Sequence, residues 1–84
     1  MYKVVFTRSV IKQFSKLPAK SYSSVFASII LLTKDPFSAA LDVSKLVDAD
    51  GFRLRVGNYR VLYSVDKSLK QIRVNAILPR RDAY

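Results

Sequence analysis

Residues 51–65 read GFRLRVGNYRVLYSV, and this stretch decides the fold. Gly57 and Asn58 separate two runs in which apolar and polar residues alternate, a pattern typical of a β-hairpin with a two-residue turn. In that register Arg55 lies directly opposite Arg60. Side chains alternate between the faces of a strand and paired residues share a face, so the pattern also predicts which side chains lie together.

The three arginines of this hairpin, Arg53, Arg55 and Arg60, are predicted to project from one face. Like charges directly opposite each other destabilise a sheet, and arginine keeps its proton at any ordinary pH. One interpretation is an outer face whose guanidinium groups are solvated, as is common for strands with one wet face. The other is an anion site in which phosphate supplies the missing negative charge. Both depend on the register, because a slip of one residue scatters the three side chains.

Length and hydropathy limit the kind of protein. The chain has 84 residues and half of them are hydrophobic, so we expect one folded domain over residues 1–84. Apolar runs are shorter than a membrane span, and the N-terminal residues contain no signal-peptide core. These features favour a cytoplasmic protein without a membrane partner.

The charge balance is more informative. The net charge is +9, from 15 lysines and arginines against six aspartates, with no glutamate and no histidine. Such a basic chain is expected to bind nucleic acid, an acidic protein or an anionic surface. Six of the seven arginines lie within residues 51–84. Because arginine contacts phosphate in a bidentate way and lysine acts as a point charge, this part is predicted to recognise phosphate.

The rest of the chain predicts two helices and further strands around the hairpin. We expect a strand over 2–6, a helix capped by Thr7, a second helix ending at Lys34, a loop with a short helical turn over 37–50, and a last strand over 71–78. The apolar stripes of the helices are predicted core: Val10, Ile11, Phe14 and Leu17, then Tyr22, Val25, Phe26, Ile29, Ile30 and Leu32. The fold class is therefore α+β in the order β-α-α-β-β-β, a small, mostly antiparallel sheet with both helices on one face.

The residue inventory excludes several kinds of chemistry. Without cysteine or histidine the chain lacks the usual metal ligands and the Cys-His and Ser-His nucleophile systems, so we expect no metal and no cofactor. Arginine, lysine, tyrosine and aspartate remain. That set suits cleavage of RNA, because RNA carries its own nucleophile in the 2′-hydroxyl and arginines stabilise a charged transition state.

Two segments carry a resemblance to a known family. GFRLRVGNYRVLY at residues 51–63, followed by RRDAY at residues 80–84, resembles the RelE-type toxins of the RelE/ParE superfamily, and the length and element order agree over the whole chain. The resemblance implies a type II toxin that enters the ribosomal A site and cleaves mRNA without metal, by attack of the 2′-hydroxyl on the adjacent phosphorus. It also implies a heterocomplex with a cognate, RelB-like antitoxin, which the basic charge predicts to be acidic and partly disordered.

The resemblance also implies roles for individual residues. Arg53 and Arg55 match basic residues that hold the phosphate and help to activate the nucleophile, and Arg60 matches the arginine that stabilises the transition state. Arg80 matches a basic residue near the leaving group, and Tyr84 matches an aromatic residue that stacks on or orients the nucleotide. Further basic residues are expected to bind RNA: Arg73, Arg81, Lys12, Lys16 and Lys20.

Two departures and one alternative bear on activity. Some members have lysine where this chain has Arg53 and Arg55, and many have histidine where it has Pro79. Because arginine is a poor general base, removal of the proton is assigned to no residue. The alternative function is a non-catalytic, ParE-like poison of DNA gyrase, although such proteins generally lack the basic and aromatic set found here.

Overall fold

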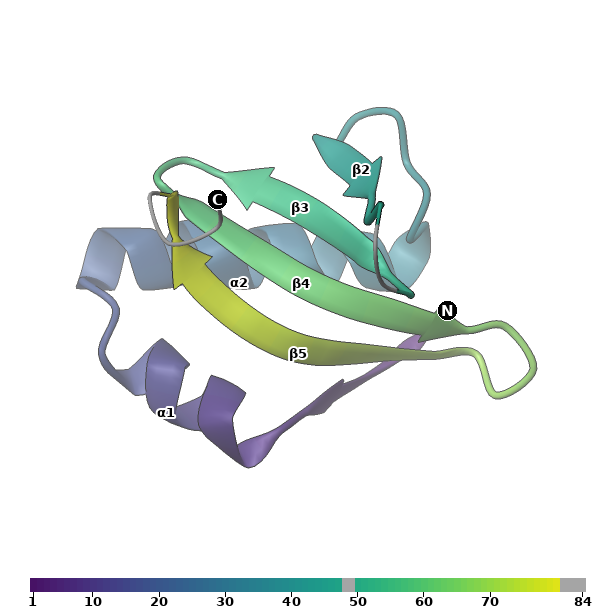
Figure 1. Cartoon of the computed structure of the whole chain (residues 1–84), viewed down its shortest axis with the longest axis horizontal. Helices are drawn as coiled ribbons and strands as arrows, with labels where there is room; N and C mark the ends of the chain where they lie inside the picture. The colour runs from purple at the N-terminus through teal and green to yellow at the C-terminus, as the bar shows by residue number, and fades with distance from the viewer. Residues whose placement is uncertain (48–49, 81–84) are drawn as a thin grey trace.

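Two helices cover one face of a five-stranded sheet in a computed structural model that describes residues 1–47 and 50–80 (Figure 1). The elements are β1 (Lys3–Phe6), α1 (Arg8–Ser15), α2 (Ala19–Lys34), β2 (Val43–Lys45), β3 (Phe52–Val56), β4 (Tyr59–Asp66) and β5 (Gln71–Pro79). The strand order is β1-β5-β4-β3-β2, parallel between β1 and β5 and antiparallel elsewhere. The predicted α+β class and helix placement are confirmed.

The hairpin has the predicted register. Arg55 pairs with Arg60 and Arg53 pairs with Leu62, while β5 returns beside β4 in a simple meander. Gly57 has a φ of 56°, a left-handed conformation that glycine adopts without steric cost. The turn at residues 57–58 therefore fixes which side chains of β3 and β4 share a face.

Local sequence signals set the helix ends. The Thr7 hydroxyl oxygen accepts a hydrogen bond of 3.2 Å from the backbone N–H of Val10, which is the expected cap of α1. α2 ends at Lys34 because Pro36 disfavours helical backbone in the residue before it. No helix in residues 1–47 and 50–80 has the length and apolar character needed to cross a membrane.

The core lies between the helices and the sheet. It includes only some of the apolar residues in the predicted stripe of each helix. Its buried apolar residues are Val10, Phe14, Val25, Ile29, Leu32, Leu54, Val61, Tyr63, Ile72, Val74 and Ile77. The prediction of core was wrong for Ile11, Tyr22, Phe26 and Ile30, which are exposed. A helix on one face of a sheet buries one side only, and these side chains flank that side. Tyr22 and Phe26 instead stack on each other, with ring centroids 6.2 Å apart.

The segment predicted as a loop with a short helical turn contains a strand. β2 pairs antiparallel with β3, Val43 opposite Leu54 and Ser44 opposite Arg53. The pairing extends one residue further, because the N–H of Arg55 donates to the carbonyl oxygen of Asp42 at 2.9 Å. Three residues are too few for a periodic pattern to be recognised, which is why the sequence did not indicate this edge strand.

Candidate nucleic-acid interface

The arginines of the hairpin lie on the sheet face opposite the helices. Leu54 and Val61 are buried toward the helices, so their neighbours Arg53, Arg55 and Arg60 point to the other face. A cross-strand row on that face runs from Asp42 to Arg55 and Arg60 and ends at Leu78 in β5.

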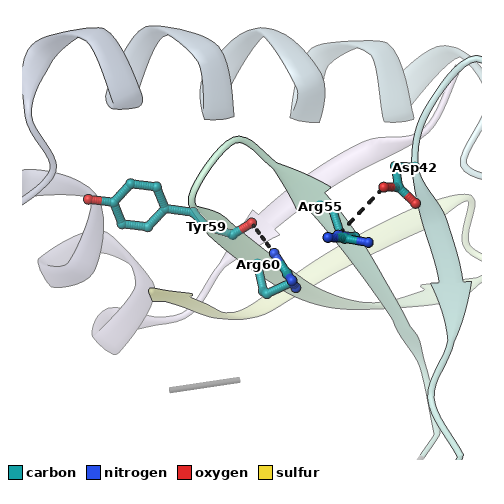
Figure 2. A network of polar contacts seen from close by, with 4 residues as sticks. All are labelled: Asp42, Arg55, Tyr59 and Arg60. Atoms are coloured by element: carbon teal, nitrogen blue, oxygen red, sulfur yellow. Dashed lines mark hydrogen bonds and ion pairs between the residues drawn. The ribbon is translucent and has the colours of Figure 1, made fainter. Parts of the chain in front are cut away.

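The two arginines of β3 differ in their surroundings. Arg55 is exposed, and its Nε lies 3.6 Å from Oδ2 of Asp42 (Figure 2). Arg53 is half-buried, and its Nε is buried without a hydrogen-bond partner among the residues that the structure describes. A buried N–H donor without a partner is costly. An anion could satisfy this donor only after a shift of the Arg53 side chain that uncovers Nε.

Arg60 differs from the interpretation of three solvated arginines. It is 0 % exposed, so that interpretation was wrong for this residue. Arg60 lies on β4, the central strand of the sheet, and its side chain is packed within the protein, whereas Arg55 lies on β3 and is open to water. Its Nη1 donates to the carbonyl oxygen of Tyr59 at 3.5 Å (Figure 2). In this conformation the guanidinium group of Arg60 must be uncovered before it can touch a ligand.

Two further predicted residues lie on or beside the arginine face, which is the side of the sheet that carries Arg53, Arg55 and Arg60. Arg80 follows β5, is exposed, and its N–H donates to the carbonyl oxygen of Asn58 at 2.7 Å, which places it beside the hairpin turn. Arg73 pairs with Ser64 and is exposed toward the other end of β5, where it lines an open cavity of about 520 Å³. The arginine face therefore extends along the sheet from the hairpin turn to Arg73.

The remaining predicted residues do not join this face. Lys12 and Lys20 are exposed on α1 and α2, and Lys16 directly follows α1, so all three belong to the helical layer on the other side of the sheet (Figure 1). Arg81 and Tyr84 lie outside the described residues. Lys12 and Lys16 are thus separated from the arginines by the sheet, whereas Lys20 lines a pocket with Gly57 and Asn58 at the hairpin turn.

Asp42 is the residue that the sequence analysis missed. Its carboxylate offsets part of the repulsion between Arg55 and Arg60, so the arginine pair does not by itself require a bound anion. Nothing in residues 37–50 indicated this neighbour, because the register of β2 was not readable. The sequence contained one weak signal of this contact, an acidic residue in a segment long enough to return to β3.

The chemistry available at this face is that of guanidinium groups. They bind phosphate oxygens through paired hydrogen bonds and stabilise negative charge that develops in a transition state. Residues 1–47 and 50–80 contain no group of three or more acidic, histidine or cysteine side chains arranged to hold a metal ion.

Comparisons with known proteins give matches among solved structures. The chain is similar to RelE in the RelE-RelB complex from the archaeon Pyrococcus horikoshii OT3, with 32 % identity over 94 % of both chains and a TM-score of 0.83. It is 26 % identical to a chain of the toxin-antitoxin complex RelBE2 from Mycobacterium tuberculosis, over 94 % of this chain and 98 % of that one, with a TM-score of 0.82. The isolated E. coli RelE toxin shares the fold, at 18 % identity over 94 % and 84 % of the chains and a TM-score of 0.80. No model of a protein family matches this chain, and no curated protein matches it.

Proposed function

This chain belongs to the RelE-type toxins of toxin–antitoxin systems, and we propose that it acts as a ribosome-dependent endoribonuclease that cleaves mRNA. The observation that carries the proposal is the arginine face. Arg53, Arg55 and Arg60 share one side of the sheet that the helices leave open, and Arg80 lies beside them at the hairpin turn.

The proposed reaction uses a nucleophile that the substrate brings. The 2′-oxygen of a ribose forms a bond to the adjacent phosphorus while the bond from phosphorus to the 5′-oxygen breaks, which leaves a cyclic phosphate and a 5′-hydroxyl end. The 2′-hydroxyl loses a proton and the leaving 5′-oxygen gains one. Because the nucleophile is part of the RNA, the proposed mechanism needs neither a metal ion nor a protein nucleophile.

The side chains of the protein bind the RNA and stabilise the transition state. Arg53 and Arg55 hold the scissile phosphate, and Arg60 stabilises the extra charge on phosphorus oxygens once it is uncovered. Arg80 neutralises the leaving group and Tyr84 stacks on a base. Arginine is too weak a base to take the proton of the 2′-hydroxyl, so we assign that step to ribosomal RNA around the bound message.

We propose an acidic antitoxin as the partner of the free toxin. The relative from P. horikoshii was solved as a RelE-RelB complex, and the one from M. tuberculosis as the toxin-antitoxin complex RelBE2. A net charge of +9 on 84 residues favours an acidic, partly disordered chain that folds as it binds and covers the arginine face. Ribosomes and mRNA bind the same positively charged face once the antitoxin is removed.

Two assays side by side test the proposed function. The purified chain is added to a cell-free translation reaction, where the 5′ ends of the mRNA are mapped against the reading frame, and to a gyrase supercoiling reaction. Ribonuclease function predicts new 5′ ends within codons only while the message is being translated, with supercoiling unchanged. Inhibited gyrase together with intact mRNA would replace this proposal with the ParE-like alternative.

A further inference from the structure

The cross-strand row from Asp42 to Arg60 brings an acidic side chain into the arginine face. Asp42 is held there by its backbone, because its carbonyl oxygen accepts the 2.9 Å hydrogen bond from the N–H of Arg55. Its carboxylate oxygen Oδ2 lies 3.6 Å from Nε of the same arginine (Figure 2). The main chain therefore places a carboxylate beside Arg55, one strand away from the like-charged Arg60.

This ion pair is weak and open to water. The Arg55 and Asp42 side chains are 44 % and 60 % exposed, and the 3.6 Å between Nε and Oδ2 is longer than a hydrogen bond. Exposed pairs of this kind contribute about 0–1 kcal/mol to stability. A phosphate that meets the planar edge of a guanidinium group in a bidentate way forms a stronger, more directional contact. An arriving phosphate therefore has the means to displace the carboxylate.

We propose that Asp42 is a specificity-determining residue that competes with phosphate for Arg55. In the free protein its carboxylate is the counterion of Arg55, and the RNA phosphate takes over that role when the complex forms. This inference rests on the proposed function only in naming RNA as the source of the phosphate. The competition lowers affinity for stray RNA, so tight binding requires the further contacts that a ribosome-bound message supplies.

The competition predicts two effects of opposite sign for Asp42→Asn. Removing the charge takes away the carboxylate beside Arg55, which faces the like-charged Arg60, so the melting temperature falls by about 2–4 °C. The same change removes a negative charge near the incoming phosphate, so the dissociation constant for RNA falls about threefold to tenfold at physiological ionic strength. A purely structural role lowers the melting temperature and leaves RNA affinity unchanged or weaker.

The test measures binding of a labelled single-stranded RNA oligonucleotide to the full chain at fixed ionic strength, without ribosomes. Asp50→Asn is the matched control, since it makes the same charge change on an exposed residue before β3. Asp50 lies five residues along the chain from Arg55, about 16 Å in an extended strand and beyond one screening length of about 8 Å at physiological salt. Asp42→Glu is the conservative variant, and it should bind RNA like the wild type because its carboxylate still reaches Arg55.

A second arm uses inorganic phosphate and the melting temperature. Phosphate should raise the melting temperature of Asp42→Asn more than that of the wild type or of Asp50→Asn, because the vacant counterion position takes the anion. Equal RNA affinity and equal phosphate stabilisation in Asp42→Asn and the wild type would overturn the proposal. Neither arm depends on cleavage or ribosomes, so a chain that fails to cleave mRNA overturns the proposed function while these results still decide the role of Asp42.

Discussion

Arg60 is completely buried and lies directly opposite Arg55 on the arginine face. These two properties together predict a role in the transition state and not in the first binding of RNA. A cation that is covered in the free protein contributes little to the first encounter with RNA. We expect Arg60→Ala to reduce single-turnover cleavage about 100-fold, the size of effect seen when a transition-state donor is removed, and to change binding less than threefold.

Arg60→Lys is the control for that prediction, because it keeps the charge and loses the fork of donors. Melting temperatures of both variants identify any loss of folded protein. A loss of binding as large as the loss of rate would make Arg60 a docking residue and contradict a role in the transition state.

The hydroxyl of Tyr63 makes the free energy of unfolding depend on pH. Its hydroxyl donates a hydrogen bond of 3.0 Å to the carbonyl oxygen of Pro36, and burial raises the pKa of Tyr63 to about 12. An unfolded tyrosine has a pKa near 10, so the native state holds this proton more tightly. The stability that follows is complete below pH 10 and is lost as the pH rises from about 10 to 12.

Chemical denaturation of the wild type and Tyr63→Phe between pH 8 and 12 checks this expectation. Each unit of difference in pKa corresponds to about 1.4 kcal/mol, so the free energy of unfolding of the wild type should fall more steeply above pH 10. The phenylalanine variant keeps the ring and removes the titrating group, and all other groups are common to both proteins. Parallel curves would show that Tyr63 does not titrate differently in the folded state.

At the scale of elements, α1 is tied to β5 by one side chain. β1 pairs with β5 only as far as Phe6 opposite Val74, and beyond that point Oε1 of Gln13 accepts a hydrogen bond of 2.7 Å from the N–H of Ile77. The Gln13 side chain thus supplies an acceptor to β5 beyond the point where the backbone pairing with β1 ends. Together with the burial of Val10 and Phe14 in the core, this hydrogen bond positions α1 on the sheet.

Gln13→Leu should lower the free energy of unfolding by about 1–3 kcal/mol, because it leaves the N–H of Ile77 without an acceptor. The measurement is urea denaturation. Gln13→Glu keeps an acceptor oxygen at the same place and should lie much closer to the wild type. A leucine variant as stable as the wild type would mean that water satisfies this N–H equally well.

The hairpin shows why much of the fold was predictable. Alternation of side chains around Gly57 fixed the register, and with it the shared face of Arg53, Arg55 and Arg60. The Thr7 cap and the stop before Pro36 are local signals in the same way. Such features depend on neighbouring residues, so the sequence contains them directly.

The features that were missed depend on contacts between distant segments. The pairing of Asp42 with Arg55 follows from a three-residue strand without a periodic pattern, and the burial of Arg60 follows from tertiary packing that the alternation of the hairpin does not encode. The exposure of Ile11, at 58 %, reflects which side of α1 meets the sheet. An apolar stripe shows that a helix has a preferred side, but not how wide the contact is.

At the scale of the whole molecule, the positive charge is divided between two sides. The arginine face is the side of the sheet that the helices do not cover, and Lys12, Lys16 and Lys20 lie in the helical layer. The sheet separates Lys12 and Lys16 from a strand bound at the arginines, whereas Lys20 lines a pocket at the hairpin turn. On the proposed function we therefore expect Lys12 and Lys16 to contact ribosomal RNA and the arginines to contact the message.

The most direct test is single-turnover cleavage of ribosome-bound mRNA by the wild type, Arg55→Ala and Arg8→Ala. Arg8 is the matched control, an exposed arginine at the start of α1 in the helical layer. We expect the wild type to cut the message, Arg55→Ala to be slower by about 10-fold to 100-fold, and Arg8→Ala to stay within about twofold of the wild type. Equal rates for wild type and Arg55→Ala, or an intact message with the wild type, would contradict the claim that the arginine face cleaves mRNA.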